Sequence, residues 1–376
     1  MRVVVAPDSF SGSLTAAQAA AAIVTGWHAA RPADVLTSVP VADGGEGTVA
    51  VVAAATRTRP TVTTVADPFG RPVEAQWLLL AGGTAVVELA AASGLWRLSP
   101  SERDPRRTTT YGTGELIRAA LDAGARTVVV GLGGSATNDG GAGLLQALGA
   151  RLLDADGREL ERGGAALARL DRVDSSGLDP RLPGVEVLAA TDVDSPLTGP
   201  AGASAVFGPQ KGANVDDVAL LDAALASWAW VVMRDVPGCP DLLGLPGGGA
   251  AGGTAAGLVA MCGARVASGA STVLGLVALH ALAGRADLLV TGEGSLDAQS
   301  VRGKAPVAVA ALARDLGVAC IALCGQVALG RQQLATAGFA AAYAVADVAP
   351  SNDDAVADAA VWLAELAGQA AREWSR

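Results

Sequence analysis

Short runs of β-branched residues that end in polar, glycine-rich loops recur along this chain, and a helix-like stretch follows most of these loops. Residues 2–6 form the first run and residues 35–41 the second, and Thr15 and Gln18 fit a capping box that opens the helix between them. Alternation of strands and helices is typical of a parallel sheet with helical crossovers. The pattern therefore predicts an α/β fold.

The pattern changes between residues 61 and 90, where three short strand-like runs are joined by turns. Such strands pair antiparallel, which indicates a second domain. From residue 286 the strand–helix alternation returns. We therefore predict two α/β domains: residues 1–60 with 286–376 form a discontinuous parallel-sheet domain, and residues 61–285 form an inserted mixed α/β domain.

The composition limits the partners of this chain. Of its 376 residues, 51% are hydrophobic and 17% are charged, which suits two buried cores. A net charge of −10 and only 3% aromatic residues argue against nucleic acid as a partner. The four scattered cysteines predict free thiols in a reducing compartment. The start of the chain shows no signal-peptide pattern, and the uncharged stretch 242–264 is rich in glycine and contains Pro246, so we expect a cytoplasmic protein with a buried helix there and no membrane partner.

Histidine is scarce, with His28 and His280 the only examples, and both lie in stretches that predict helix packing or a surface position. A Ser-His-Asp or Cys-His hydrolase would need one of them in its site. The sequence therefore favours carboxylates as the groups that transfer protons.

Five polar loops are candidates for the functional site, because ligands of open α/β sheets bind outside the carboxyl ends of the strands. The first, residues 7–13, carries Asp8 and Ser9 ahead of a helix N-terminus. That terminus would favour an anion. A helix cap by Ser13 or Thr15 explains the same residues without a ligand.

The second loop, residues 42–47, contains three glycines and the acids Asp43 and Glu46. Glycines such as Gly44 let the backbone approach a ligand closely, and the acids suit a metal ion or a sugar-like hydroxyl group. A glycine-rich turn capped by Asp43 is the structural alternative.

The third loop, residues 131–141, follows a strand-like run and can form a nest of backbone amides. Its candidate anion-binding residues are Gly133, Gly134, Ser135, Thr137 and Asn138. Gly131, Gly133 and Ala136 also match the looser dinucleotide pattern G-x-G-x-x-A, with Asp154 or Asp156 where a ribose-binding acid would fall. Because polar residues stand where that pattern needs helix-packing ones, we favour phosphate binding over nicotinamide binding.

The fourth loop carries Asp192 and Asp194 after the strand-like run 185–189. If the strand continues, their spacing turns both carboxylates to one face. Such a pair can hold Mg²⁺ or deprotonate a hydroxyl group. Lys211 follows in a turn-rich stretch that by itself predicts a surface position.

The fifth loop carries Glu293 and Asp297, and Arg302 and Lys304 open the helix after it. This combination offers acids for a metal ion and cations for a transferring phosphoryl group. It is not a Walker A loop, because alanines replace the first glycine and the Ser/Thr of that motif.

Taken in order, the five loops resemble the bacterial glycerate kinase family of the first type. The matching stretches are residues 6–10, 42–48, 133–141, 207–212 and 291–294. The resemblance implies transfer of the γ-phosphoryl group of ATP to a hydroxyl group of D-glycerate with Mg²⁺, and 2-phosphoglycerate is the expected product ahead of 3-phosphoglycerate. It also implies a flavodoxin-like domain and a second domain likened to restriction enzymes.

The hypothesis assigns a role to each candidate residue. Asp8 or Asp192 would accept the hydroxyl proton, and Lys211 and Lys304 would face the transferring phosphate. Asp194, Glu293 and Asp297 would share Mg²⁺. The substrate- or phosphate-binding residues would be Ser9, Asp43, Gly44, Gly133, Gly134, Ser135, Thr137, Asn138 and Arg302.

One residue departs from the family pattern, because Ser11 stands where the family commonly has lysine. The change predicts weaker binding of an anion or a different substrate, unless Lys211, Arg302 or Lys304 supplies the charge. Two other functions stay open: a nicotinamide-dependent oxidoreductase that uses residues 131–136, and a catalytically impaired ligand-binding relative. The oligomeric state also stays open, with a homodimer as one option.

Overall fold

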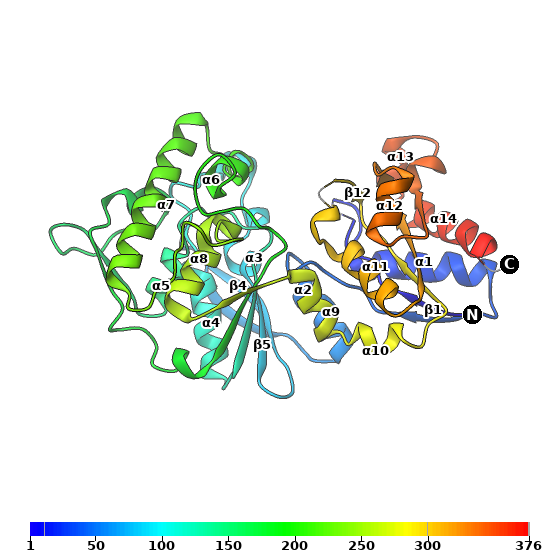
Figure 1. Cartoon of the computed structure of the whole chain (residues 1–376), viewed down its shortest axis with the longest axis horizontal. Helices are drawn as coiled ribbons and strands as arrows, with labels where there is room; N and C mark the ends of the chain where they lie inside the picture. The colour runs from blue at the N-terminus through cyan, green and yellow to red at the C-terminus, as the bar shows by residue number, and fades with distance from the viewer. Residues whose placement is uncertain (11, 299, 375–376) are drawn as a thin grey trace. The chain divides into compact units, whose positions relative to one another are not determined.

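The computed structural model describes residues 1–10, 12–298 and 300–374. They form two compact units (Figure 1). Unit 1 comprises Met1–Asp43, Ala50–Arg57 and Ser268–Arg376, and unit 2 comprises Gly44–Val49 and Thr58–Ala267. Both units combine helices with a main sheet, so the predicted α/β class is confirmed.

Unit 1 is built on a five-stranded sheet in which every neighbouring pair is parallel. Its strands, in spatial order, are β2 (Val35–Ser38), β1 (Arg2–Val5), β11 (Leu288–Thr291), β13 (Ala319–Cys324) and β15 (Ala341–Ala344). Numbered along the chain this order is 2-1-3-4-5, which is the flavodoxin order. The switch point lies between β1 and β11, because the chain adds β2 on one side of β1 and later adds β11 on the other. The flavodoxin-like prediction is confirmed.

The helices of unit 1 flank this sheet, and two parallel two-residue strands, β12 (Ser295–Leu296) and β14 (Gln326–Val327), lie outside it. The helices are α1 (Ala16–Ala30), α2 (Thr48–Thr56, which begins in unit 2), α9 (Gly269–Leu276), α10 (Leu279–Ala283), α11 (Ala305–Asp315), α12 (Arg331–Ala337), α13 (Asn352–Ala357) and α14 (Ala359–Trp374), with 3₁₀ turns η6 (Ser300–Arg302) and η7 (Val345–Asp347). The last two helices, α13 and α14, meet at Asp358.

Helices α1 and α14 pack closely against each other. A side chain at Gly26 would bring its Cβ atom within 1.8 Å of the Ala364 carbonyl oxygen, so glycine is required there. Next to it Trp27 is fully buried, and its indole donates a hydrogen bond to Asp34 at 3.0 Å. The core of unit 1 therefore lies between this helix pair and the parallel sheet.

Unit 2 contains a six-stranded mixed sheet. Its strands, in spatial order, are β3 (Thr61–Ala66), β4 (Pro72–Leu79), β5 (Thr84–Glu88), β6 (Thr127–Gly131), β9 (Glu186–Ala190) and β10 (Arg265–Ala267). The first three pair antiparallel, as predicted for residues 61–90, and the pairs from β5 to β10 are parallel. A separate antiparallel pair joins β7 (Arg151–Leu153) to β8 (Arg172–Asp174).

Helices cover the mixed sheet and carry the long loops of unit 2. They are α3 (Leu89–Ser93), α4 (Tyr111–Asp122), α5 (Ala142–Ala147), α6 (Ala203–Phe207), α7 (Val215–Asp235) and α8 (Ala250–Cys262), with 3₁₀ turns η1 (Leu95–Arg97), η2 (Pro100–Glu102), η3 (Gly164–Arg169), η4 (Leu182–Gly184) and η5 (Pro209–Lys211). The uncharged stretch 242–264 forms the buried α8 and its glycine-rich entry, as predicted. None of the helices in the described ranges is both long and apolar enough to span a bilayer.

Apart from residues 58–60, which belong to unit 2, the unit boundaries differ from the predicted domain boundaries at two places. Residues 268–285 belong to unit 1, because α9 and α10 pack on α11. Gly44–Val49 belong to unit 2, because Gly44 and Gly45 lie against the loop after β6 and Val49 donates to Glu88. Neither of these two segments contains a strand, so the periodicity of the sequence does not indicate the unit to which each belongs.

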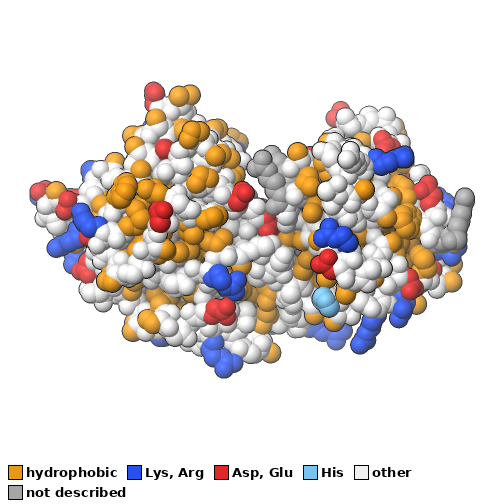
Figure 2. Space-filling view, viewed as in Figure 1, with side chains coloured by type: hydrophobic (Ala, Val, Ile, Leu, Met, Phe, Trp, Pro, Cys, Tyr) orange, Lys and Arg blue, Asp and Glu red, His pale blue; other side chains and the backbone are white. Residues whose placement is uncertain are grey.

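Charged side chains are spread over the surface in both signs. On the face shown in Figure 2, Lys and Arg side chains lie among Asp and Glu side chains, with hydrophobic side chains between them. Both histidines, His28 and His280, are exposed on helices, in agreement with the surface position predicted for them.

Candidate functional site

Two loops of unit 1 meet at the switch point of the parallel sheet, where β1 and β11 end. The Asp8 amide donates to the Gly292 carbonyl at 2.8 Å, and the Thr291 hydroxyl donates to the Ala6 carbonyl at 2.7 Å. These two bonds bring Asp8 and Glu293 to the same edge of the sheet. This edge is where open α/β sheets bind their ligands.

Four acids of unit 1 are linked by electrostatic interactions, and we call them the acidic cluster: Asp8, Asp43, Glu293 and Asp297. Asp8 is only 9% exposed, and burial, reinforced by the charges of Asp43 and Glu293, raises its pKa to about 8. The Ser9 amide, 2.6 Å from the Asp8 carboxylate, opposes this rise. Burial also raises the pKa of Glu293, with Asp297 and Asp43 adding to the effect and Ser300 and Lys304 opposing it.

The acidic cluster has a donor set that suits a hard divalent cation. Glu293 is 7% exposed, and its buried Oε1 atom has no hydrogen-bond partner among the described residues. No three His, Cys, Asp or Glu side chains in the described ranges are grouped so that they could enclose a metal ion by themselves. Mg²⁺ does not need such a cage, because it usually keeps several waters and takes one or two carboxylates together with substrate phosphates. The cluster therefore fits Mg²⁺ in this partial manner.

The helix N-terminus after the first loop is capped by its own residues. Thr15 and Gln18 form the predicted capping box, in which the Gln18 amide donates to Thr15 Oγ1 at 3.2 Å and the Thr15 amide donates to Gln18 Oε1 at 2.9 Å. The cap alternative for this loop is therefore confirmed, and α1 offers fewer free donors to an anion. Ser11 and the side chain of Arg302 lie outside the described residues.

In unit 2, Lys211 lies in the interior, and the prediction of a surface position from its local sequence was wrong. Its side chain is 2% exposed, and its Nζ atom donates to Ser135 Oγ at 2.8 Å and to the Thr137 carbonyl at 2.6 Å. Burial lowers the pKa of Lys211 to about 7, and the nearby charge of Asp139 opposes the change. We call Lys211, Ser135 and Thr137 the lysine cradle.

The loop that carries the cradle is fixed by a buried acid. Asp139 accepts hydrogen bonds from the Thr110 amide at 2.8 Å, from the Thr110 hydroxyl at 2.9 Å and from the amides of Gly141 and Gly143. Asn138 donates to Ser204 at 2.9 Å. Thr137 Oγ1 and Asn138 Oδ1 are buried and have no hydrogen-bond partner in the described part of the chain. Unpaired buried polar atoms beside a buried cation are typical of a site that a ligand completes.

Two glycines of this loop, Gly131 and Gly133, lie against Gly44 and Gly45. A Cβ atom at Gly131 would lie 2.3 Å from the Gly44 carbonyl oxygen, and one at Gly133 would lie 2.4 Å from the Gly45 Cα atom. These glycines therefore allow two loops of unit 2 to touch. In addition, α5 begins only at Ala142, well beyond the G-x-G-x-x-A match. Both facts contradict a dinucleotide-binding fingerprint, in which the glycines face the pyrophosphate and open the helix.

Asp192 and Asp194 do not continue a strand. β9 ends at Ala190, and the following residues are irregular, so the condition for both carboxylates to share a face is not met. Asp192 is half-buried, whereas Asp194 is exposed. Both belong to unit 2, whereas Glu293, Asp297 and Lys304 belong to unit 1.

The number of lysines in the chain also points to two of the candidate residues. Lysine occurs only twice in the chain, as Lys211 and Lys304, and every other cationic side chain is arginine. Lys304 is the N-cap residue of α11, and its charge opposes the rise in the pKa of Glu293. Lys211 forms the lysine cradle. Lysine offers a compact point charge that arginine does not. Lysine is confined to two of the candidate loops, a pattern that a count of residue types reveals.

Comparison with known proteins supports one family. The model of the glycerate kinase family matches residues 3–375. The chain is 44% identical over 368 residues to the glycerate kinase of Bacillus subtilis strain 168, covering 98% of this chain and 96% of that protein. It is 45% identical over 326 residues to the glycerate 2-kinase of Escherichia coli K12, covering 86% and 85% of the two chains. A crystal structure of a candidate glycerate kinase 2 from Salmonella typhimurium LT2 superposes with a TM-score of 0.85 at 43% identity, covering 99% of this chain and 98% of that one.

Proposed function

Since this chain belongs to the glycerate kinase family and is a phosphotransferase, we propose that it transfers the γ-phosphoryl group of ATP to the 2-hydroxyl group of D-glycerate. Relatives named glycerate kinase and glycerate 2-kinase support the substrate and the position. Each unit of the chain supplies one part of this chemistry.

The observation that carries the proposal is the buried Lys211. Its Nζ atom is hydrogen-bonded only to a hydroxyl and a carbonyl oxygen, both neutral, and no ion pair to it occurs among the described residues. A buried cation is costly unless an anion compensates it. A phosphate group would provide that anion and would restore the full charge of the lysine. Such fixed positive charge stabilises a transferring phosphoryl group.

Asp8 is our candidate for the group that accepts the proton of the hydroxyl group. A pKa of about 8 lies close to neutral pH, where a carboxylate is a stronger base than an ordinary aspartate. Asp192 is the alternative base in unit 2. Asp8→Asn should remove the acid limb of the pH profile of kcat/KM, whereas the same result with Asp192→Asn and not with Asp8→Asn would assign the role to Asp192.

Glu293 and Asp297 are the residues that we propose to hold Mg²⁺. Bound there with the nucleotide, Mg²⁺ would neutralise charge on the phosphates. Lys304, which already offsets the charge of Glu293, would face the same phosphates. Asp194 stays a weaker candidate, because it is exposed and belongs to the other unit.

The direct test is ADP release with ATP, Mg²⁺ and D-glycerate, coupled to an enzyme that accepts only 2-phosphoglycerate. A positive signal in both assays supports the kinase and the 2-position together. ADP release without the coupled signal would favour 3-phosphoglycerate. Two simpler acids provide matched controls: D-lactate retains only the 2-hydroxyl group, and 3-hydroxypropionate retains only the 3-hydroxyl group. Turnover of D-lactate alone would support the proposed position.

Ser11 allows the substrate to be tested separately from the reaction. If Ser11→Lys lowers the KM for D-glycerate several-fold and leaves kcat unchanged, the position contributes a charge for the substrate carboxylate. If the wild-type chain raises its melting temperature with D-glycerate but releases no ADP, it is the impaired ligand-binding relative and the proposal fails.

A further inference from the structure

A second cationic region of unit 2 surrounds a cavity of about 590 Å³. Its charged and aromatic lining consists of Phe69, Arg106, Arg107, Glu161, Arg162 and Arg169. Four arginines against one glutamate make this lining cationic, although the chain carries a net charge of −10. The volume falls within the range of roughly 300–1,000 Å³ that is usual for small-molecule sites. We call this cavity the arginine pocket.

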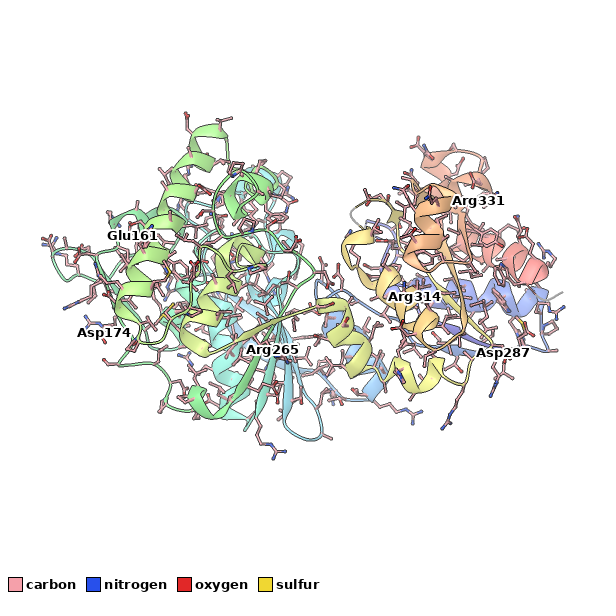
Figure 3. The ribbon with its side chains drawn as sticks, in the orientation of Figure 1. Glu161, Asp174, Arg265, Asp287, Arg314 and Arg331 are labelled. Atoms are coloured by element: carbon pink, nitrogen blue, oxygen red, sulfur yellow. The ribbon has the colours of Figure 1, made fainter. Side chains whose placement is uncertain are left out.

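Only two of the four arginines are neutralised by carboxylates. Arg106 forms ion pairs with Asp104 at 2.8 Å and with Asp217 at 3.1 Å. Arg169 pairs with Glu161, which lies in the loop before η3 and is labelled in Figure 3. The one acid that lines the pocket, Glu161, is therefore already paired.

Arg107 and Arg162 form no ion pair within the described ranges and instead lie over aromatic rings. The guanidinium carbon of Arg162 is 3.3 Å from the ring centre of Tyr111, and that of Arg107 is 5.5 Å from the ring centre of Phe69. Ring contacts of this kind orient a guanidinium group without consuming its hydrogen-bond donors. The pocket therefore presents two oriented forks that have donors available for an oxyanion.

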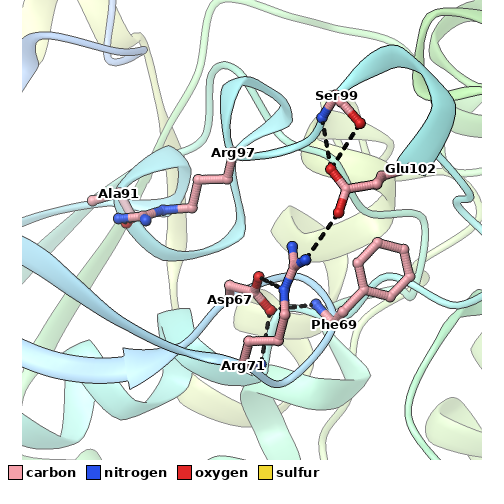
Figure 4. A network of polar contacts seen from close by, with 7 residues as sticks. All are labelled: Asp67, Phe69, Arg71, Ala91, Arg97, Ser99 and Glu102. Carbon is pink, nitrogen blue, oxygen red and sulfur yellow. Dashed lines mark hydrogen bonds and ion pairs between the residues drawn. The ribbon is translucent and has the colours of Figure 1, made fainter.

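The walls of the pocket are fixed by hydrogen bonds. Figure 4 shows the turn that carries Phe69: the Phe69 amide donates to Asp67 at 2.8 Å, and Arg71 links Asp67 to Glu102. The Thr109 amide donates to the Pro68 carbonyl at 2.9 Å, and the Ala165 amide donates to the Arg106 carbonyl at 3.0 Å. A preformed wall lowers the ordering cost of binding.

The same backbone segment that lines the pocket also holds the loop of the lysine cradle. Thr109 lines the pocket, while its neighbours Thr108 and Thr110 bond to that loop. The Thr108 hydroxyl donates to the Ala136 carbonyl at 2.8 Å, and Thr110 donates to Asp139. A ligand that orders residues 106–109 would therefore also order the segment that fixes residues 136–139.

We propose that the arginine pocket binds a small phosphate-bearing metabolite at a site separate from the lysine cradle, and that binding stabilises residues 133–141. Arg107 and Arg162 contact the phosphate oxygens, and Arg106 and Arg169 add charge to the rim. Planar forks match phosphate oxygens in pairs, which point charges do not. The size of the cavity selects a small molecule and not a polymer.

Calorimetric titration with inorganic pyrophosphate tests the binding. Because pyrophosphate also resembles the phosphates of ATP, it can bind in the lysine cradle as well. The Lys211→Met variant is used to impair that second site. We expect Lys211→Met to retain pyrophosphate binding in the arginine pocket, and Arg107→Gln combined with Arg162→Gln in the Lys211→Met background to weaken that remaining binding at least tenfold. The matched control is Arg158→Gln, because Arg158 is exposed, pairs with Asp156 and does not line the pocket. Binding that is lost in Lys211→Met and retained in the double variant would overturn the proposal.

Hydrogen exchange tests the link to the cradle. In the Lys211→Met protein, pyrophosphate should slow amide exchange in residues 104–110 and 133–141, and the added Arg107→Gln and Arg162→Gln changes should abolish the effect. Slower exchange in residues 104–110 alone would refute the link to the lysine cradle but would still support binding in the arginine pocket. If the double variant does not fold, as judged by its circular dichroism spectrum, Arg107→Lys and Arg162→Lys replace it, because they keep the charge and remove the fork.

Discussion

The candidate groups of unit 1 and of unit 2 are both buried, but they carry opposite charges and have different partners. In unit 1 burial raises the pKa of both Asp8 and Glu293, the charge of Glu293 adds to the rise at Asp8, and Glu293 Oε1 has no partner among the described residues. In unit 2 the ammonium group of Lys211 is held by neutral oxygens, and burial lowers its pKa to about 7. In each region burial thus disfavours the charged form, which a ligand of opposite sign would favour. This contrast is why we propose a metal ion for unit 1 and a phosphate group for unit 2.

The largest effect should come from removing the buried cation. Lys211→Met keeps a long apolar side chain in the same space but removes the charge, and we expect kcat to fall about 10²–10³-fold because one electrostatic contact to the transferring phosphoryl group is lost. The Mg²⁺ concentration for half-maximal rate should not change. Steady-state kinetics at varied Mg²⁺ would measure both values. A kcat within threefold of wild type would remove Lys211 from the chemistry.

A smaller and different effect should come from the acidic cluster. Glu293→Gln should raise the Mg²⁺ concentration for half-maximal rate about 10–100-fold, because a carboxylate oxygen near the ion is replaced by an amide. The matched control is Asp315→Asn, since the Asp315 side chain is 71% exposed in the same unit. If Lys211→Met and Glu293→Gln shift the Mg²⁺ requirement equally, the two regions do not divide the work as proposed.

Periodicity predicted the fold of unit 1 well, because each parallel strand is a buried apolar run with a polar loop at its end. The predicted run 2–6 contains the whole of β1, and the Thr15–Gln18 capping box places the start of α1. The predicted strand 35–41 is shorter, since it ends at Ser38, two residues before Pro40, which has no amide proton for a ladder. The segments that changed unit, 44–49 and 268–285, are fixed by packing between distant residues. Local pattern contains no information about such packing.

The candidate residues were easier to list than to place. Their loops follow strands, which sequence shows, but the burial of Lys211 depends on Ser135 and Thr137, more than seventy residues away. The same limit applies to Gly131 and Gly133, because the sequence does not show that their neighbours are Gly44 and Gly45. A glycine-rich stretch predicts that another group approaches the backbone closely, but it does not indicate which group.

The pKa of the buried lysine can be measured directly, because the chain has only two lysines. A lysine-selective ¹³C label should give two side-chain signals, and Lys211→Met should remove the one that titrates near pH 7. Because the folded-state pKa of Lys211 lies below its ordinary value of 10.5, Lys211 contributes stability that is present above about pH 10.5 and lost as the pH falls through 7. Urea unfolding should therefore show a rise in stability with pH that the variant lacks. A signal that titrates only near pH 10 would break the comparison between the units.

The smallest expected effect concerns Glu88, which ends β5 and binds the loop 44–49. Its buried carboxylate accepts a hydrogen bond from the Val49 amide, and burial raises its pKa to about 7. An acid whose folded-state pKa is raised contributes stability below its ordinary pKa of 4.5, and this contribution is lost as the pH rises through 7.

Glu88→Gln keeps an acceptor for the Val49 amide and removes this pH dependence. We expect the variant to be less stable than wild type at pH 5 by about 1–3 kcal/mol relative to their difference at pH 8, which urea unfolding at the two pH values would measure. Glu74→Gln, at an exposed position on β4, is the control. A difference that does not change with pH would mean that Glu88 is charged throughout. The loop 44–49 would then be held by a carboxylate and not by a carboxylic acid, and of the two groups Glu88 and Lys211 only Lys211 would have its charged form disfavoured by burial.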